Sequence, residues 1–169
     1  MPRHLGDKVL VCVAEGFGLG RIPFAPGTWG TLLGFVWIWL LLIPQNLWLY
    51  LLGTVLGFFG AVYVGGKAEK ILNQKDPNRI VIDEIAAMPL AFLGCLVFTG
   101  PAPLSSFLQP GKWHLLLLSF LLFRVFDVLK PLGIAKSQNL PGGWGLVVDD
   151  FLAALLVAAL MALITKWSL

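Results

Sequence analysis

The sequence predicts an all-α fold: a polytopic membrane helical bundle with a re-entrant Gly/Pro-rich loop at its cytoplasmic face. Hydrophobic residues make up 58% of the 169 residues and charged residues only 12%, about half the charged share of a soluble domain. One small soluble core could not bury so much apolar surface. The apolar residues also gather in segments near membrane-spanning length. We therefore expect residues 1–169 to form a single membrane domain.

Five apolar segments are the expected membrane spans, and the stretches between them are rich in turn-forming residues. Residues 5–15 predict a short amphipathic helix, and residues 16–30, with five glycines and two prolines, predict irregular backbone. The first span is short for a hydrocarbon core about 30 Å thick. The spans are residues 31–43, 47–64, 80–99, 113–129 and 147–165. They are joined by a tight turn at 44–46, a polar segment with a short helix at 65–79, a Pro-rich turn at 100–112 and a Gly/Pro/Asn loop at 130–146.

The distribution of basic residues predicts the orientation of these spans. If the amino terminus is cytoplasmic, the outer side holds only Lys112 and Lys166. The other ten basic residues fall on the cytoplasmic side or near its membrane face: Arg3, Lys8, Arg21, Lys67, Lys70, Lys75, Arg79, Arg124, Lys130 and Lys136. This asymmetry is the positive-inside pattern. Because the net charge is only +3 and the basic residues are scattered, we expect no nucleic-acid binding.

Five of the nine carboxylates lie inside the apolar segments or at their ends, which is costly in a membrane. An ionised carboxylate at such a position costs at least about 2.5–3.5 kcal/mol, and such residues usually line an ion path, a proton relay or a metal site. The predicted topology places all five near the cytoplasmic end. They are Asp83, Glu84, Asp127, Asp149 and Asp150.

Ion pairs and helix capping are the simplest alternative explanation of these acids. Arg124, Lys130 and Arg79 could pair with some of them, and Asp149 or Asp150 could cap a helix. However, too few bases lie nearby to neutralise five carboxylates. A hard divalent cation would supply the missing charge, and all-oxygen ligands without clustered histidine or cysteine favour Mg²⁺.

Spacing along the helices suggests different roles for neighbouring acids. Asp83 and Glu84 are about 100° apart on a helix, so we expect one of them to be a direct ligand and the other an outer base. Asp149 and Asp150 are also neighbours, so we expect one direct ligand and one outer base there too, unless the helix of residues 147–165 begins between them. The expected metal ligands are Asp83, Asp127, Asp149 and Asp150, and the expected catalytic carboxylates are Asp83, Glu84, Asp127 and Asp150.

Two further features predict a phosphate site. Gly27 and Thr28 stand where a glycine-rich turn leads into a helix, so backbone amides and the helix dipole can converge on an anion. A plain turn with Thr28 as the helix cap is an equally good explanation. Arg124 shares a helix face with Asp127, and an arginine there can bind two phosphate oxygens. Lys130 adds a point charge, unless it only extends to the lipid headgroups.

Four motifs in this order resemble the phosphatidylglycerophosphatase A family: GFGLGRIPFAPGTWGTL, VIDEIAAMPLAF, FRVFDVLKPLGI and GGWGLVVDDFLA. The resemblance runs from about residue 10 to residue 160. It implies a Mg²⁺-dependent enzyme of the bacterial inner (cytoplasmic) membrane, with its active site facing the cytoplasm. The implied substrate is phosphatidylglycerophosphate, which loses its terminal phosphate to give phosphatidylglycerol. Ala87 stands where the family usually has glycine and Thr31 where it often has serine, and neither difference changes a charge.

Two other functions fit part of the sequence. A membrane cation transporter would use the acids as an ion path, but it would need acids through the depth of the bilayer, and none is predicted in the outer half. A non-catalytic lipid-binding subunit would explain the aromatic residues but not the clustered carboxylates.

Overall fold

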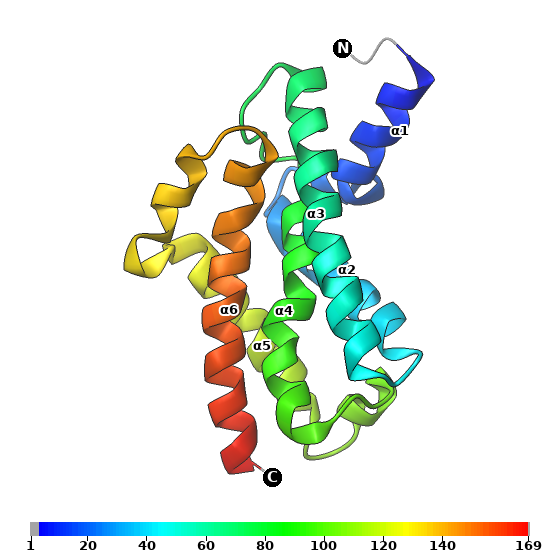
Figure 1. The fold of residues 1–169 in the computed structure, drawn as a ribbon, viewed down its shortest axis with the longest axis vertical. Coiled ribbons are helices and arrows are strands. Elements are labelled where there is room, and N and C mark those ends of the chain that lie inside the picture. The colour runs from blue at the N-terminus through cyan, green and yellow to red at the C-terminus, as the bar shows by residue number, and fades with distance from the viewer. Residues whose placement is uncertain (1–3, 169) are drawn as a thin grey trace.

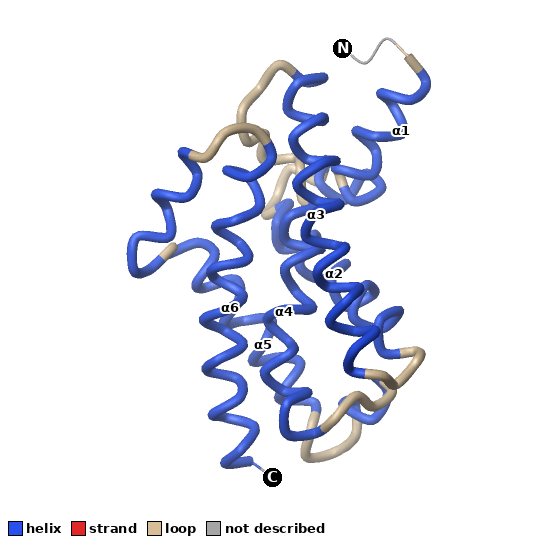
Figure 2. Tube along the Cα trace, in the orientation of Figure 1, coloured by secondary structure: helices blue, strands red, loops and turns tan. Residues whose placement is uncertain are grey.

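The computed structural model describes residues 4–168, and this part of the chain folds into helices joined by turns (Figures 1 and 2). The all-α prediction is therefore confirmed. The α-helices are α1 (Leu5–Ala14), α2 (Pro26–Leu42), α3 (Leu47–Leu72), α4 (Ile82–Thr99), α5 (Trp113–Leu129) and α6 (Gly143–Ser168). Short 3₁₀ helices lie between them: η1 (Gly16–Arg21), η2 (Leu104–Leu108) and η3 (Pro131–Asn139).

Helix α4 is the centre of the bundle and packs against α2, α3, α5 and α6. Its contact with α6 is the most extensive, and glycine makes the close approach possible. A side chain at Gly94 would collide with the carbonyl oxygen of Ala158 on α6. On the α2 side, a Cβ at Gly34 would lie 2.6 Å from the Cβ of Met88. These close contacts hold α4 at fixed distances from α2 and α6.

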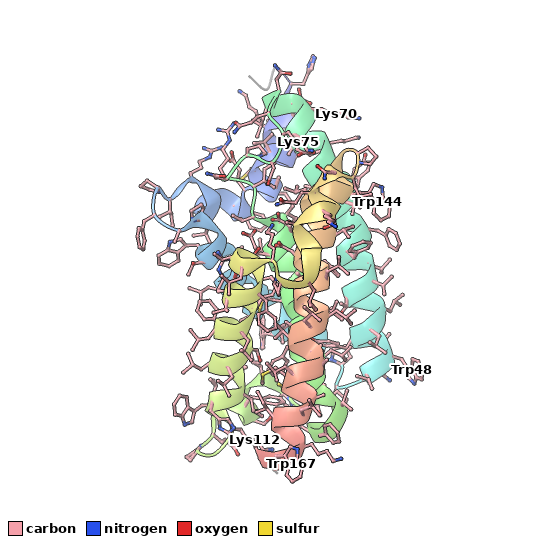
Figure 3. All side chains as sticks on the ribbon, turned by 90° about the vertical axis from the view of Figure 1, so that its left-hand side faces the viewer. Trp48, Lys70, Lys75, Lys112, Trp144 and Trp167 are labelled. Atoms are coloured by element: carbon pink, nitrogen blue, oxygen red, sulfur yellow. The ribbon has the colours of Figure 1, made fainter. Side chains whose placement is uncertain are left out.

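The two ends of the bundle carry different parts of the chain. The amino-terminal region, residues 73–81 and the connection from η3 to α6 lie at one end (Figure 1). The α2–α3 turn, the α4–α5 connection and the carboxyl terminus lie at the other. Trp48 and Trp167 lie near the second end and Trp144 near the first (Figure 3). Tryptophans at both ends of apolar helices are typical of the two membrane interfaces.

Each predicted span lies within one helix, except that Ile43 lies just after the end of α2 and residues 80–81 lie just before the start of α4. Three described helices, α3, α4 and α6, are long and apolar enough to cross a membrane, and α2 is a shorter apolar helix. Helix α5 has the predicted bounds of 113–129. The side of the membrane that each end faces stays a prediction. Arg3, which contributes to the charge argument, lies outside the described residues.

The structure corrects three of the expected boundaries. The prediction of irregular backbone over residues 16–30 holds as far as Ala25, because η1 is interrupted by left-handed conformations at Phe17 and Gly18. It is wrong from Pro26 onward, where α2 begins with a residue favoured in the first helical turn. Helix α3 continues through the predicted polar segment to Leu72 and ends at Asn73, which adopts a left-handed conformation with φ 51°. The predicted loop at 130–146 contains η3 and the first turn of α6. A re-entrant path for the glycine-rich segment stays a prediction.

Candidate active site

A pocket of about 250 Å³ lies where the first turns of α2, α4 and α6 meet the end of α5. Six carboxylates and two basic side chains line it, so its acids outnumber its bases by four. These charged residues are Asp76, Asp83, Glu84, Asp127, Asp149, Asp150, Arg124 and Lys130. The pocket thus brings together all five of the acids that the sequence singled out, together with both predicted basic residues. We call it the carboxylate pocket.

Three of the acids form a compact cluster. Asp83 and Glu84 lie in the first turn of α4, and Asp150 lies in the second turn of α6. One carboxylate oxygen from each of the three lies within 4.8 Å of the others. Asp83 and Glu84 thus reach the same space despite their different directions on the helix.

The cluster fits a hard cation. Asp83 and Asp150 are only 7% and 3% exposed. One oxygen of each of Asp83, Glu84, Asp149 and Asp150 is buried without any hydrogen-bond partner. Buried carboxylate oxygens without partners are costly, and a divalent cation with oxygen ligands would satisfy them.

Asp127 is instead paired with a base. Arg124 Nη1 donates a hydrogen bond to Asp127 Oδ2 at 2.6 Å and lies 3.8 Å from Glu84 Oε1. Arg124 Nη1 also donates to Thr31 Oγ1 on α2 at 3.4 Å. Arg124 therefore links α2, α4 and α5 at the pocket. Thr31 and Arg124 could not be linked from the sequence, because they lie far apart along the chain and meet only in the folded bundle.

Asp149 and Lys130 form the second ion pair of the pocket. Asp149 accepts a hydrogen bond from Lys130 Nζ, whereas Asp150 belongs to the Asp83–Glu84–Asp150 cluster. Different roles for Asp149 and Asp150 stay a prediction. Burial alone would lower the pKa of Lys130, but its hydrogen bond to Asp149 and the nearby carboxylates outweigh burial and raise it. Lys130 therefore stays charged in the pocket. Asp149 and Asp150 lie well inside α6, so neither caps it.

Gly27 and Thr28 differ in their relation to the pocket. Gly27 lines it, and a side chain there would collide with Glu84 Oε1 and lie 3.0 Å from Arg124 Nη1. Thr28 does not cap α2: the cap is Ala25, without a side-chain hydrogen bond. Thr28 is also absent from the lining of the pocket. The helix begins earlier than expected, which moves Thr28 into its first turn.

Asp76 is a pocket residue that the sequence argument missed. It lies in the connection between α3 and α4, where Asp76–Pro77 predicts only a turn. Although Asp76 is exposed as a residue, its side chain lines the pocket, and desolvation there together with the charge of Asp149 raises its pKa. The available signal was its acidic side chain close before the start of α4.

Apolar helices that gather carboxylates and two bases at one end define a class of protein, a helical bundle with an acidic pocket suited to a hard cation. The family model described as phosphatidylglycerophosphatase A matches residues 12–165. The chain belongs to the phosphatidylglycerophosphatase A family.

The curated relatives cover most of the chain. A phosphatidylglycerophosphatase A of Haemophilus influenzae is 34% identical over 93% of this chain and 89% of its own length. The protein of the same name in Escherichia coli is 29% identical over 88% of this chain and 79% of its own. A protein of Bacteroides thetaiotaomicron named putative phosphatidylinositol-3-phosphatase is 35% identical over 93% of both chains. No solved structure matches.

Proposed function

We propose that this protein hydrolyses phosphatidylglycerophosphate to phosphatidylglycerol and phosphate in a Mg²⁺-dependent reaction. The observation that carries the proposal is the carboxylate pocket in a chain of the phosphatidylglycerophosphatase A family. The proposed location is the bacterial inner membrane, with the pocket on the cytoplasmic side. Support for that side comes from the ten-to-two distribution of basic residues.

The proposed cation site is centred on the Asp83–Glu84–Asp150 cluster. Asp149, which also lines the pocket, has one buried oxygen without a partner, and Asp127 would join through the oxygen that Arg124 does not contact. When bound, Mg²⁺ would polarise the phosphate and lower the pKa of a coordinated water. The carboxylate left free of the metal would accept a proton from the attacking water.

The basic residues and the start of α2 are assigned to the phosphate. The Arg124 guanidinium can donate to two phosphate oxygens at once, while Lys130 supplies a fixed positive charge. The amide of Gly27 belongs to the first turn of α2, where N–H groups lack intrahelical partners. These donors stabilise negative charge as it develops on the phosphoryl group. Thr28 keeps at most a supporting role through the same helix start.

Phosphatidylinositol 3-phosphate is a second candidate substrate. The specific support for it is the name of the Bacteroides relative, which matches this chain at 35% identity. Both lipids carry a phosphate monoester that the same carboxylate pocket could hydrolyse.

A phosphate-release assay on the purified protein tests the proposal. The substrates are phosphatidylglycerophosphate, phosphatidylinositol 3-phosphate and phosphatidic acid, each with Mg²⁺ and with a chelator. We expect the highest kcat/KM for phosphatidylglycerophosphate and no turnover with the chelator. A preference for phosphatidylinositol 3-phosphate would favour the second candidate. Absence of release from every lipid would favour a transporter or a non-catalytic lipid-binding subunit.

A further inference from the structure

A second group of charged residues lies beside the carboxylate pocket and has no role in the site described above. Glu15, the residue that ends α1, is fully buried (0% exposed). Arg21 Nε donates to Glu15 Oε2 at 2.7 Å, and Arg79 Nε lies 3.2 Å from Glu15 Oε1. Within residues 4–168, Glu15 is the sole ion-pair partner of either arginine. One buried carboxylate thus orients two guanidinium groups from different segments.

The two arginines remain accessible to a ligand. Their side chains are 63% and 46% exposed for Arg21 and Arg79 respectively. They line a cavity of about 350 Å³, which we call the arginine pocket, together with Gly20, Ile22, Pro23, Pro26 and Asn78. Two guanidinium charges against one carboxylate leave one net positive charge. With each arginine held through Nε, its terminal N–H groups are available to an anion.

Backbone contacts hold the arginine pocket in shape. The N–H of Gly20 donates to the carbonyl oxygen of Glu15 at 2.9 Å. A side chain at Gly20 would collide with the carbonyl oxygen of Arg79. The segments that carry the two arginines are therefore packed directly on one another, so the guanidinium groups are in place before a ligand binds.

The arginine pocket adjoins the carboxylate pocket at the start of α2. Pro26 and Asn78 line both cavities. Close to them, Phe24 is 80% exposed, and its carbonyl oxygen accepts a hydrogen bond from the half-exposed Trp29 at 3.2 Å. Exposed aromatic side chains of this kind are typical of the headgroup region of a membrane.

We propose that Arg21 and Arg79 bind the phosphodiester group of the lipid substrate while its terminal phosphate occupies the carboxylate pocket. This inference rests on the proposed function. The substrate carries two phosphates joined by a glycerol bridge, and the protein has two adjoining pockets, one of which is lined by accessible arginines and by no acid. Phosphatidic acid has a monoester but no phosphodiester, so the arginine pocket would select against it.

The first test compares kinetics on the two lipids in an uncharged detergent, where the substrate is the sole source of a phosphodiester. Arg21→Gln and Arg79→Gln should each lower kcat/KM for phosphatidylglycerophosphate on the order of tenfold, corresponding to about 1.4 kcal/mol. The kcat/KM for phosphatidic acid should change less than about twofold. Arg79→Lys should lose less than Arg79→Gln, because it keeps the charge but not the fork. Lys75→Gln, at an exposed position in the same connection, is the matched control and should behave as wild type.

The second test uses product inhibition, which separates the two phosphates even where phosphatidic acid is turned over slowly. In the arginine variants, the inhibition constant of phosphatidylglycerol should rise and that of inorganic phosphate should not. Equal loss on both lipids, or an unchanged inhibition constant for phosphatidylglycerol, would show that the arginines only neutralise Glu15. Melting temperatures identify variants that fail to fold. If the glutamine variants do not fold, Arg79→Lys, which keeps the charge, is used for the same kinetic comparison. A wild-type protein that releases no phosphate from phosphatidylglycerophosphate would contradict the proposed function itself.

Discussion

At the scale of single residues, Arg124 connects the most parts of the candidate site. Its Nη1 atom contacts Asp127 at 2.6 Å, Glu84 at 3.8 Å and Thr31 at 3.4 Å. Two roles follow from these contacts. Arg124 neutralises part of the acid cluster in the absence of substrate, and it can turn its remaining donors toward a phosphate.

Arg124→Lys should lower kcat/KM for the lipid substrate on the order of tenfold, or about 1.4 kcal/mol of transition-state stabilisation. Lysine keeps the positive charge but cannot donate to two oxygens in one plane. Steady-state kinetics and the melting temperature are measured on the same preparation. A variant that melts earlier yet retains wild-type kinetics per folded molecule would restrict Arg124 to a structural role.

Asp76 should give the protein a pH-dependent cost in stability. Desolvation and the charge of Asp149 raise its pKa above the ordinary value of 3.8. The unfolded chain therefore releases this proton at a lower pH than the folded protein, so stability falls as the pH rises from 3.8 through the folded-state pKa. The cost is complete above that pKa and absent below 3.8.

Asp76→Asn should consequently raise the melting temperature of the metal-free protein at pH 7. The difference from wild type should narrow as the pH is lowered toward 4. Melting curves in chelator at a series of pH values measure this. A difference that does not vary with pH would mean that the charge of Asp76 is not the cause.

At the scale of helices, the contact between α4 and α6 sets the geometry of the acid cluster. Asp83 and Glu84 are on one of these helices and Asp150 is on the other, so any change in their separation moves the carboxylates apart. The close approach of the two helices at Gly94 and Ala158 lies further along the same contact.

Gly94→Ala should therefore destabilise the protein by about 2 kcal/mol, the usual range for overpacking a tight contact. The matched control is Gly60→Ala on α3, where an added Cβ meets nothing within 4 Å. That change should leave the stability equal or slightly higher, because alanine is the better helix former. Thermal unfolding in detergent compares the two variants. Equal melting temperatures would contradict the tight α4–α6 contact.

The presence of the main helices was predictable from the sequence. Several helix boundaries and several contacts between side chains on different helices were not. Helix α5 has the predicted bounds because the largely apolar segment after Lys112 ends at Lys130, which precedes Pro131 and adopts a left-handed conformation. The start of α2 was missed because Gly27 and Gly30 suggested a loop, yet they lie inside the helix. A side chain at either would collide with Glu84 or Val81. Glycine in a sequence does not say whether it serves a turn or a close contact.

The candidate site shows the same division. Acids on separate predicted spans could be placed at one depth by counting along the chain, which brought Asp83, Asp127 and Asp150 together. The Arg124–Asp127 pair follows from the helix face that these residues share. The choice of Asp149 as the partner of Lys130 could not be predicted, because it depends on side-chain directions between helices. The link from Arg124 to Thr31 and the contribution of Asp76 therefore emerged only from the fold.

At the scale of the whole molecule, the arrangement of the helices agrees with an odd number of membrane crossings, since the two terminal regions lie at opposite ends (Figure 1). Lys70 and Lys75 lie near one end and Lys112 near the other (Figure 3). The end with two of these three lysines is the one that carries the carboxylate pocket.

The amino terminus should be cytoplasmic and the carboxyl terminus external. Reporter fusions after Leu169 and within residues 67–79 measure this. The fusion after Leu169 should report an external location and the fusion in the 67–79 segment a cytoplasmic one. A cytoplasmic signal from the carboxyl-terminal fusion would contradict five crossings.

The most direct test of the central claim is a Mg²⁺ titration of phosphate release from phosphatidylglycerophosphate by wild type and by Asp150→Asn. The substitution keeps the volume of the side chain but removes one charge from the Asp83–Glu84–Asp150 cluster. We predict saturable activation of wild type by Mg²⁺ and a loss of about 100-fold or more in the variant, which is about 2.7 kcal/mol. The variant should melt no lower than wild type in chelator, because the substitution removes a buried charge that no metal then neutralises. Phosphate release that does not depend on Mg²⁺, or a folded Asp150→Asn variant with wild-type rate and Mg²⁺ dependence, would contradict the account.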